Sequence, residues 1–106
     1  MKRERTADDR VQAVASLAKA LADENRLRII RALTSGKKAV SQIVEELGIS
    51  QPLASHHLKE LKRALLVVVE RRGPFIYYEL SDPRTAEIVA SLDALAGDLL
   101  ARRTTL

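Results

Sequence analysis

Residues 50–61 read Ser-Gln-Pro-Leu-Ala-Ser-His-His-Leu-Lys-Glu-Leu, and this stretch decides how the chain is interpreted. Ser50 suits the N-cap of a helix, and Pro52 suits its first turn because the amide proton that proline lacks has no acceptor inside the helix. Apolar residues recur at three- and four-residue steps and share one face, which consists of Ala54, Leu58, Leu61 and Leu65. The stretch therefore predicts an amphipathic helix with one buried face.

Two further helices are predicted shortly before this one. Ser41 can cap a helix that Gly48 closes, and Asp23 can cap an earlier helix that ends near Gly36. Their apolar sets are Ile43, Val44 and Leu47 in the first case and Leu27, Ile29, Ile30 and Leu33 in the second. Only Ile49 and Ser50 separate Gly48 from the helix at residue 51, so the two helices meet at a tight turn. Residues 37–40 form either a loop or a short strand.

A basic hairpin is predicted after these helices. Residues 67–71 and 75–80 are rich in β-branched and aromatic side chains, and they flank Arg72-Gly73-Pro74. The fold class is therefore mainly α with a small β-hairpin, in one domain that spans residues 1–106.

Each end of the chain carries a helix with an apolar stripe. The predicted helices cover residues 7–22 and residues 82–103, the second opened by Asp82 as N-cap and Pro83 in the first turn. Such stripes either cover the core of their own chain or join two chains. Their members are Val11, Val14, Leu17 and Leu21 in the first helix and Ile88, Leu92, Leu95 and Leu99 in the last.

Composition excludes several classes of function. The formal net charge of +4 suits a polyanionic partner, although it would also suit an acidic membrane surface or simple solubility. There is no cysteine, so disulfides and thiolate metal sites are excluded. No signal peptide or membrane-spanning run is evident, which predicts a cytoplasmic protein without a membrane partner. No nucleophile with a base, carboxylate pair or metal cluster stands out, so we expect no enzyme.

The order of these elements over residues 17–80 resembles the ArsR/SmtB family of small dimeric bacterial repressors. The resemblance is carried by residues 21–30, which read Leu-Ala-Asp-Glu-Asn-Arg-Leu-Arg-Ile-Ile, by residues 49–58 and by the hairpin residues 73–80. It implies a winged helix-turn-helix transcriptional repressor, with a homodimer joined by the two apolar stripes and a palindromic double-stranded DNA operator. A winged-helix module that binds another protein is the alternative, because fold does not dictate function.

The same resemblance identifies residues 50–61 as part of a DNA recognition helix. Gln51 can bond an adenine edge, Ser55 and His56 can bond bases or phosphates, and Lys59 suits a phosphate. His57 lies beside the apolar face and is predicted to be partly buried and hydrogen-bonded. Lys37, Lys38 and the basic N-terminus are further candidate backbone contacts. The full predicted DNA-binding set is Ser50, Gln51, Pro52, Ser55, His56, Lys59, Arg63, Arg71 and Arg72.

The metal sites typical of this family are missing from the sequence. Ala39-Val40-Ser41 stands where family sensors often carry Cys-Val-Cys, and no histidine follows Leu80 to join the carboxylates of the last helix. We therefore expect no metal and no cofactor. An organic effector, a protein partner or no effector at all remain open. Leu65 stands where many members have glycine, so the recognition helix is expected to end differently or to run longer.

Overall fold

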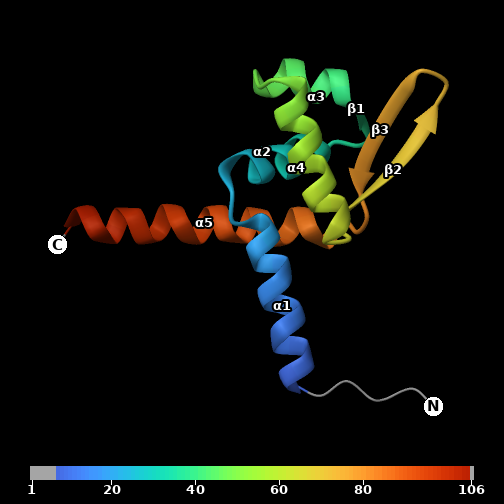
Figure 1. Ribbon diagram of the computed structural model, residues 1–106. Coiled ribbons are helices and arrows are strands. Elements are labelled where there is room, and N and C mark those ends of the chain that lie inside the picture. The colour runs from blue at the N-terminus through green and yellow to red at the C-terminus, as the bar shows by residue number, and fades with distance from the viewer. Residues whose placement is uncertain (1–6, 106) are drawn as a thin grey trace, which may run out of the picture.

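The computed structural model describes residues 7–105, so the basic N-terminus predicted to contact DNA lies outside the described residues. Helices α2, α3 and α4 pack together, and α1 and much of α5 extend away from them (Figure 1). A hairpin of β2 and β3 projects on one side. The elements are α1 (Ala7–Leu21), α2 (Glu24–Leu33), β1 (Lys38–Ala39), α3 (Val40–Leu47), α4 (Gln51–Arg63), β2 (Val67–Arg72), β3 (Phe75–Leu80) and α5 (Arg84–Thr105).

The hydrophobic core lies between α2, α3 and α4. Removing a large aliphatic side chain from water stabilises the fold by roughly 1.5–3 kcal/mol. The largest fully buried side chains are Ile29, Ile30, Ile43, Leu58 and Leu61. The buried face predicted for α4 is thus confirmed at Ala54, Leu58 and Leu61, and it leaves the opposite face of this helix exposed.

Local capping fixes where the central helices begin and end. Asp23 caps α2 by accepting from the amide of Arg26 at 3.0 Å, and Ser50 caps α4 by accepting from the amide of Leu53 at 3.3 Å. Gly48 closes α3 with a left-handed φ of 66°. These three predictions are confirmed.

The cap predicted for α3 is wrong. Ser41 lies inside the first turn, because α3 already begins at Val40. The side-chain carbonyl of Gln42 instead accepts from the amide of Ala39 at 2.8 Å. The glutamine side chain therefore provides the hydrogen-bond acceptor for the amide of the residue that precedes α3.

The wing belongs to a three-stranded antiparallel sheet with the order β1-β3-β2. Residues 37–40, which the sequence left as loop or strand, contribute β1, and Lys38 pairs with Tyr78 of β3. Arg72 is the last residue of β2 and pairs with Phe75, so the turn consists of Gly73 and Pro74. Gly73 has a φ of 58°, a conformation that glycine adopts without steric cost.

Two expectations about Leu65 are wrong. Its side chain is 80% exposed and not part of the buried face of α4. Its φ is 66°, so leucine adopts the left-handed conformation that usually requires glycine. The amides of Leu65 and Leu66 donate to the carbonyls of Lys62 and Leu61 at 2.9 and 3.0 Å, which ends the helix in a Schellman motif. The hydroxyl of Ser81 donates to the carbonyl of Leu65 at 2.6 Å and holds this turn in place.

Replacing Leu65 with glycine is expected to raise the free energy of unfolding by about 0.5–1 kcal/mol, because the left-handed strain disappears while little apolar burial is lost. Urea denaturation measures this change. Leu65→Ala is the matched control, since it keeps a Cβ atom at positive φ and should bring no gain. An equal gain from both variants would show that the strain is not the cause.

Candidate nucleic-acid interface

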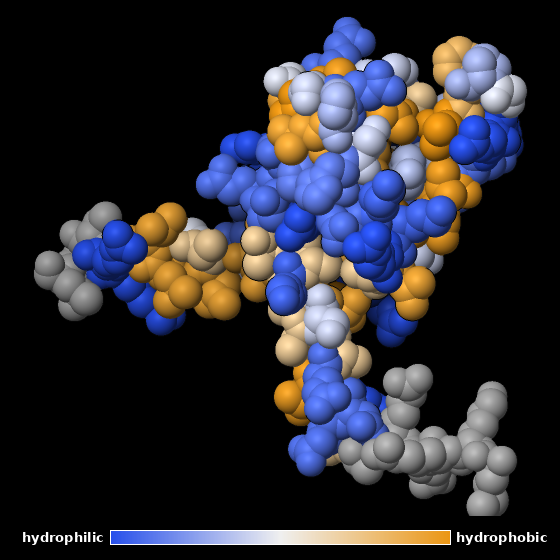
Figure 2. All heavy atoms as spheres, viewed as in Figure 1, coloured by the Kyte–Doolittle hydropathy of each residue, from blue (hydrophilic) through white to orange (hydrophobic). Residues whose placement is uncertain are grey.

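Helix α4 exposes one polar face along its whole length. All seven of its predicted DNA-binding residues are exposed, which is consistent with the predicted assignment of faces; they are Ser50, Gln51, Pro52, Ser55, His56, Lys59 and Arg63. Hydrophilic side chains cover much of this part of the molecule (Figure 2). The side chains that can hydrogen-bond base edges are gathered toward the N-terminal half of the helix, and the cations lie toward its C-terminal half.

The two cations of this face differ in their surroundings. Within residues 7–105, no carboxylate lies at ion-pair distance from Lys59, whereas Arg63 Nη1 lies 3.2 Å from Glu60 Oε1. Both arginine and glutamate are on the helix surface, where such a pair is weak and readily exchanged for a phosphate. Of these two cations, Lys59 is thus the one with its charge fully available.

Most of the cations around the wing form ion pairs with carboxylates of the same chain. Glu70 accepts from Lys37 Nζ at 2.8 Å and from Arg72 Nε at 2.7 Å, and these two hydrogen bonds hold the pKa of Glu70 below its ordinary value. Lys38 Nζ lies 2.6 Å from Glu46 Oε2. Arg71 is exposed. Of the candidate phosphate contacts near the sheet, three therefore have a carboxylate partner within their own chain.

An exposed aromatic residue next to the wing turn was not among the predicted site residues. Phe75 is exposed at the start of β3, and its ring lies 6.3 Å from that of Tyr77. The sequence signal was the aromatic side chain directly after Gly73-Pro74, which interrupts an otherwise polar hairpin turn. The wing thus offers an apolar contact beside its arginines.

His57 differs from His56 as the sequence predicted. It is only 5% exposed and its Nδ1 lies 3.3 Å from Arg26 Nη1, which confirms a buried, hydrogen-bonded residue. Burial lowers the pKa of His57, although the nearby carboxylate of Asp23 acts in the opposite direction. His56 remains exposed on the polar face.

The apolar stripes of α1 and α5 are mostly exposed in the single chain. The exposed members are Val11, Val14, Leu17, Ile88, Leu92, Leu95 and Leu99, and Leu100, which was not predicted, extends the patch. Figure 2 shows the hydrophobic surface along the projecting part of α5. Leu21 is a correction: it is 8% exposed and packs in the core of its own chain, because α1 meets α2 at this end.

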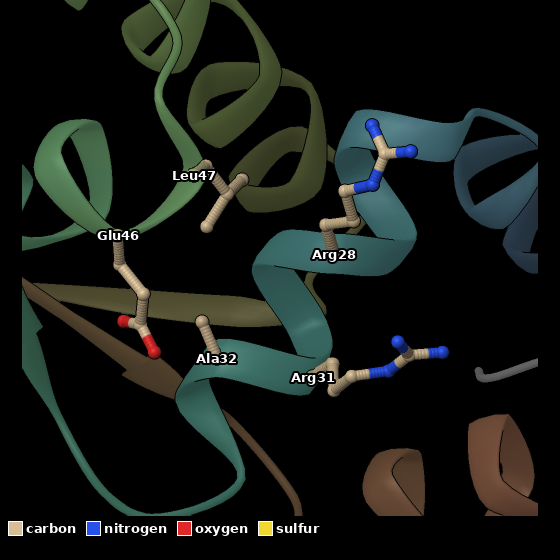
Figure 3. A pocket seen from close by; sticks show the side chains of 5 residues that line it. All are labelled: Arg28, Arg31, Ala32, Glu46 and Leu47. Carbon is tan, nitrogen blue, oxygen red and sulfur yellow. The ribbon is translucent and has the colours of Figure 1, made fainter.

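A hollow between α2 and α3 gathers two further arginines (Figure 3). Its lining consists of Arg28, Arg31, Ala32, Glu46 and Leu47. The two guanidinium groups point away from each other and from Glu46, and they pair separately with Glu24 and Asp93. The arginines therefore do not converge on a common ligand.

Within residues 7–105, no three His, Cys, Asp or Glu side chains come together in a way that could hold a metal ion. No helix in the same range is long and apolar enough to cross a membrane.

Comparison with known proteins shows that the chain is similar to bacterial transcriptional regulators. Residues 23–68 match the model of the bacterial regulatory proteins of the arsR family. The chain is 39% identical over 88 residues to the HTH-type transcriptional repressor SmtB of Mycobacterium tuberculosis, and this match covers 83% of the chain and 65% of the repressor. The chain thus spans about 65% of the length of that relative.

Two further relatives match over nearly their whole length. An uncharacterised HTH-type transcriptional regulator of Methanocaldococcus jannaschii is 35% identical, with 82% of the chain and 99% of the relative covered. A solution structure of a homodimeric winged helix-turn-helix DNA-binding domain from Mycobacterium bovis, described as a possible ArsR-family regulator, superimposes with a TM-score of 0.79. Its sequence is 30% identical, with 92% of the chain and 91% of the domain covered. The fold is accordingly a winged helix-turn-helix.

Proposed function

Since the chain belongs to the arsR family of bacterial regulatory proteins, we propose that it is a DNA-binding transcriptional regulator that reads duplex DNA with α4. The observation that carries this proposal is the exposed polar face of α4. Its hydrogen-bonding groups at Gln51, Ser55 and His56 face outward, while the opposite side of the helix is buried. A helix presented in this way fits the major groove.

The proposed working form is a homodimer through α1 and the projecting part of α5. Burying the exposed apolar side chains of both helices would be favourable, and a second copy of the chain carries the same stripe to pack against them. Two recognition helices related by a twofold axis would read a palindrome whose half-sites lie one helical turn apart, about 34 Å. The M. bovis domain with the same fold is homodimeric, which supports this assembly.

Repression is the mode of regulation that we propose. The SmtB relative is a transcriptional repressor, and a bound dimer can block transcription without contacting polymerase. A DNA target also places the protein in the cytoplasm, where a bacterial chromosome lies. The chain has no cysteine, so the proposal includes no thiolate metal site, and it includes no catalytic role. A winged helix that binds only a protein partner is the competing function.

Salt dependence of DNA binding separates the two functions. A fluorescent duplex should bind with an affinity that falls steeply between about 50 and 200 mM salt, with a log–log slope near −0.9 for each phosphate contacted. Lys59, Arg63 and Arg71 of two protomers are the cations expected to contribute. Fluorescence anisotropy measures the slope. Absence of binding to every duplex selected from a random pool, or a flat salt dependence, would favour a protein-binding module.

A further inference from the structure

One partly buried polar cluster joins three helices behind the recognition face, and His57 is its buried member. Arg26 Nε donates to the carbonyl of Ala20 at the end of α1 at 2.6 Å, and its Nη1 lies 3.3 Å from Nδ1 of His57 on α4. Asp23, the N-cap of α2, lies with Oδ1 3.8 Å from Nε2 of the same histidine. The residues of this α1–α2–α4 cluster are thus Ala20, Asp23, Arg26 and His57.

The contacts of the cluster determine which nitrogen of His57 carries the proton. A guanidinium group can only donate hydrogen bonds, so Nδ1 of His57 must accept from Arg26. Nδ1 is therefore unprotonated, and the proton of the neutral ring lies on Nε2, on the side of the Asp23 carboxylate. The cluster is built around a neutral histidine in one tautomer.

Protonation of His57 would remove the contact with Arg26. A proton on Nδ1 would face the guanidinium group, so that two donors and two positive charges would meet. Asp23 and Glu60 favour the protonated ring, whereas Arg26, His56 and above all burial oppose it, and the balance lowers the pKa of His57. The neutral ring is therefore favoured, and acidification forces either an unfavourable buried charge or a rearrangement of the cluster.

The position of the cluster connects this event to DNA recognition. His57 follows His56 directly in α4, and Ala20 lies in the last turn of α1, the helix that carries the first apolar stripe. In a dimer built through α1 and α5, the angle between α1 and α4 sets the distance between the two recognition helices. A rearrangement of Arg26 and His57 would change that angle, although neither side chain lies on the exposed polar face.

We propose that Arg26 and His57 are positioning residues that hold the recognition helix against the corner between α1 and α2, and that protonation of His57 weakens operator binding. This inference rests on the proposed DNA-binding function. It predicts a regulator that releases DNA when the surroundings become acidic, with neutral His57 as the form competent to bind.

The test compares full-length variants that differ at position 57. His56→Gln is introduced first, so that position 57 carries the only remaining histidine of the chain. His57→Gln is the decisive variant, since the glutamine amide offers an acceptor to Arg26 and a donor to Asp23 without titrating. His57→Ala removes both groups and is expected to bind more weakly at every pH.

Fluorescence anisotropy is measured at pH 7.5 and pH 5.0 at constant ionic strength, with a duplex selected from a random pool. The His56→Gln protein should lose several-fold in affinity at the lower pH, with tenfold as the upper limit for a difference of about one pKa unit between free and bound protein. The His56→Gln/His57→Gln protein should bind equally at both values. Circular dichroism at both pH values checks that each variant is folded.

The possible results are distinguishable. Equal pH dependence with histidine and with glutamine at position 57 would overturn the inference but leave the DNA-binding function intact. Unchanged binding by His57→Ala at pH 7.5 would overturn the positioning role. If the unaltered protein bound no duplex at pH 7.5, the proposed function and the inference would both fail.

Discussion

Replacing Leu92 and Leu95 together with glutamate is expected to convert the protein into a monomer and to lower its affinity for a two-half-site operator by at least about 100-fold. Both leucines lie on the projecting part of α5 and are 47% and 51% exposed in the single chain. In a homodimer they would be covered by the partner, so each glutamate would place a charge in an apolar interface. Sedimentation velocity and DNA anisotropy measure the two effects.

Ala94→Glu provides a matched control for this variant. At about 100° per residue, position 94 lies away from the stripe of Ile88, Leu92, Leu95 and Leu99 on the same helix. It is exposed, so a glutamate should cost little there. If the double variant remained a dimer, or if the control dissociated as well, the apolar stripe of α5 would not be the dimer interface.

Replacing Gln51 or His56 with alanine is expected to remove sequence preference without a comparable loss of general DNA binding. A lost base contact costs about 1–3 kcal/mol, which is roughly 5- to 150-fold on the preferred duplex. Affinity for a scrambled duplex should stay nearly constant, because neither variant removes a fixed positive charge. The ratio of the two affinities, measured by competition anisotropy, reports the change.

Lys59→Ala should behave in the opposite way. It removes a cation with no carboxylate partner in the described part of the chain, so binding to preferred and scrambled duplexes should weaken by the same factor. The salt slope should become shallower by about one for each protomer. Lys19→Ala removes an exposed charge from α1, on the side opposite to its apolar stripe, and should leave both quantities unchanged. Identical behaviour of all the α4 variants would refute this division of roles.

The sequence predicted the parts of the fold that depend on local interactions. Asp23, Gly48 and Ser50 each act within one helical turn, so their roles are visible in a short stretch of residues. The assignment of His57 to the buried side followed from its position relative to Leu58 and Leu61. Periodicity thus predicted which face of α4 is exposed.

The sequence could not predict features that depend on distant residues. Leu65 adopts a left-handed conformation while Leu66 is buried in the core and Ser81 binds the turn, and these contacts outweigh its local preference. Leu21 continues the stripe of α1 by spacing, yet packing against α2 buries it in its own chain. The pair of Lys37 with Glu70 joins residues 33 positions apart, so no local pattern could indicate it.

Glu70 has a consequence for how the protein would search a chromosome. Its carboxylate already holds Lys37 and Arg72, so the charge of both cations is partly neutralised within the chain until a phosphate exchanges with Glu70. Lys37 and Arg72 then contribute less than Arg71 to the time spent on unrelated sequences, where attraction to the backbone is the main source of affinity. We therefore expect the protein to spend less time at each unrelated site as it diffuses along DNA. Lys37 and Arg72 would bind phosphates fully only after α4 has recognised its bases.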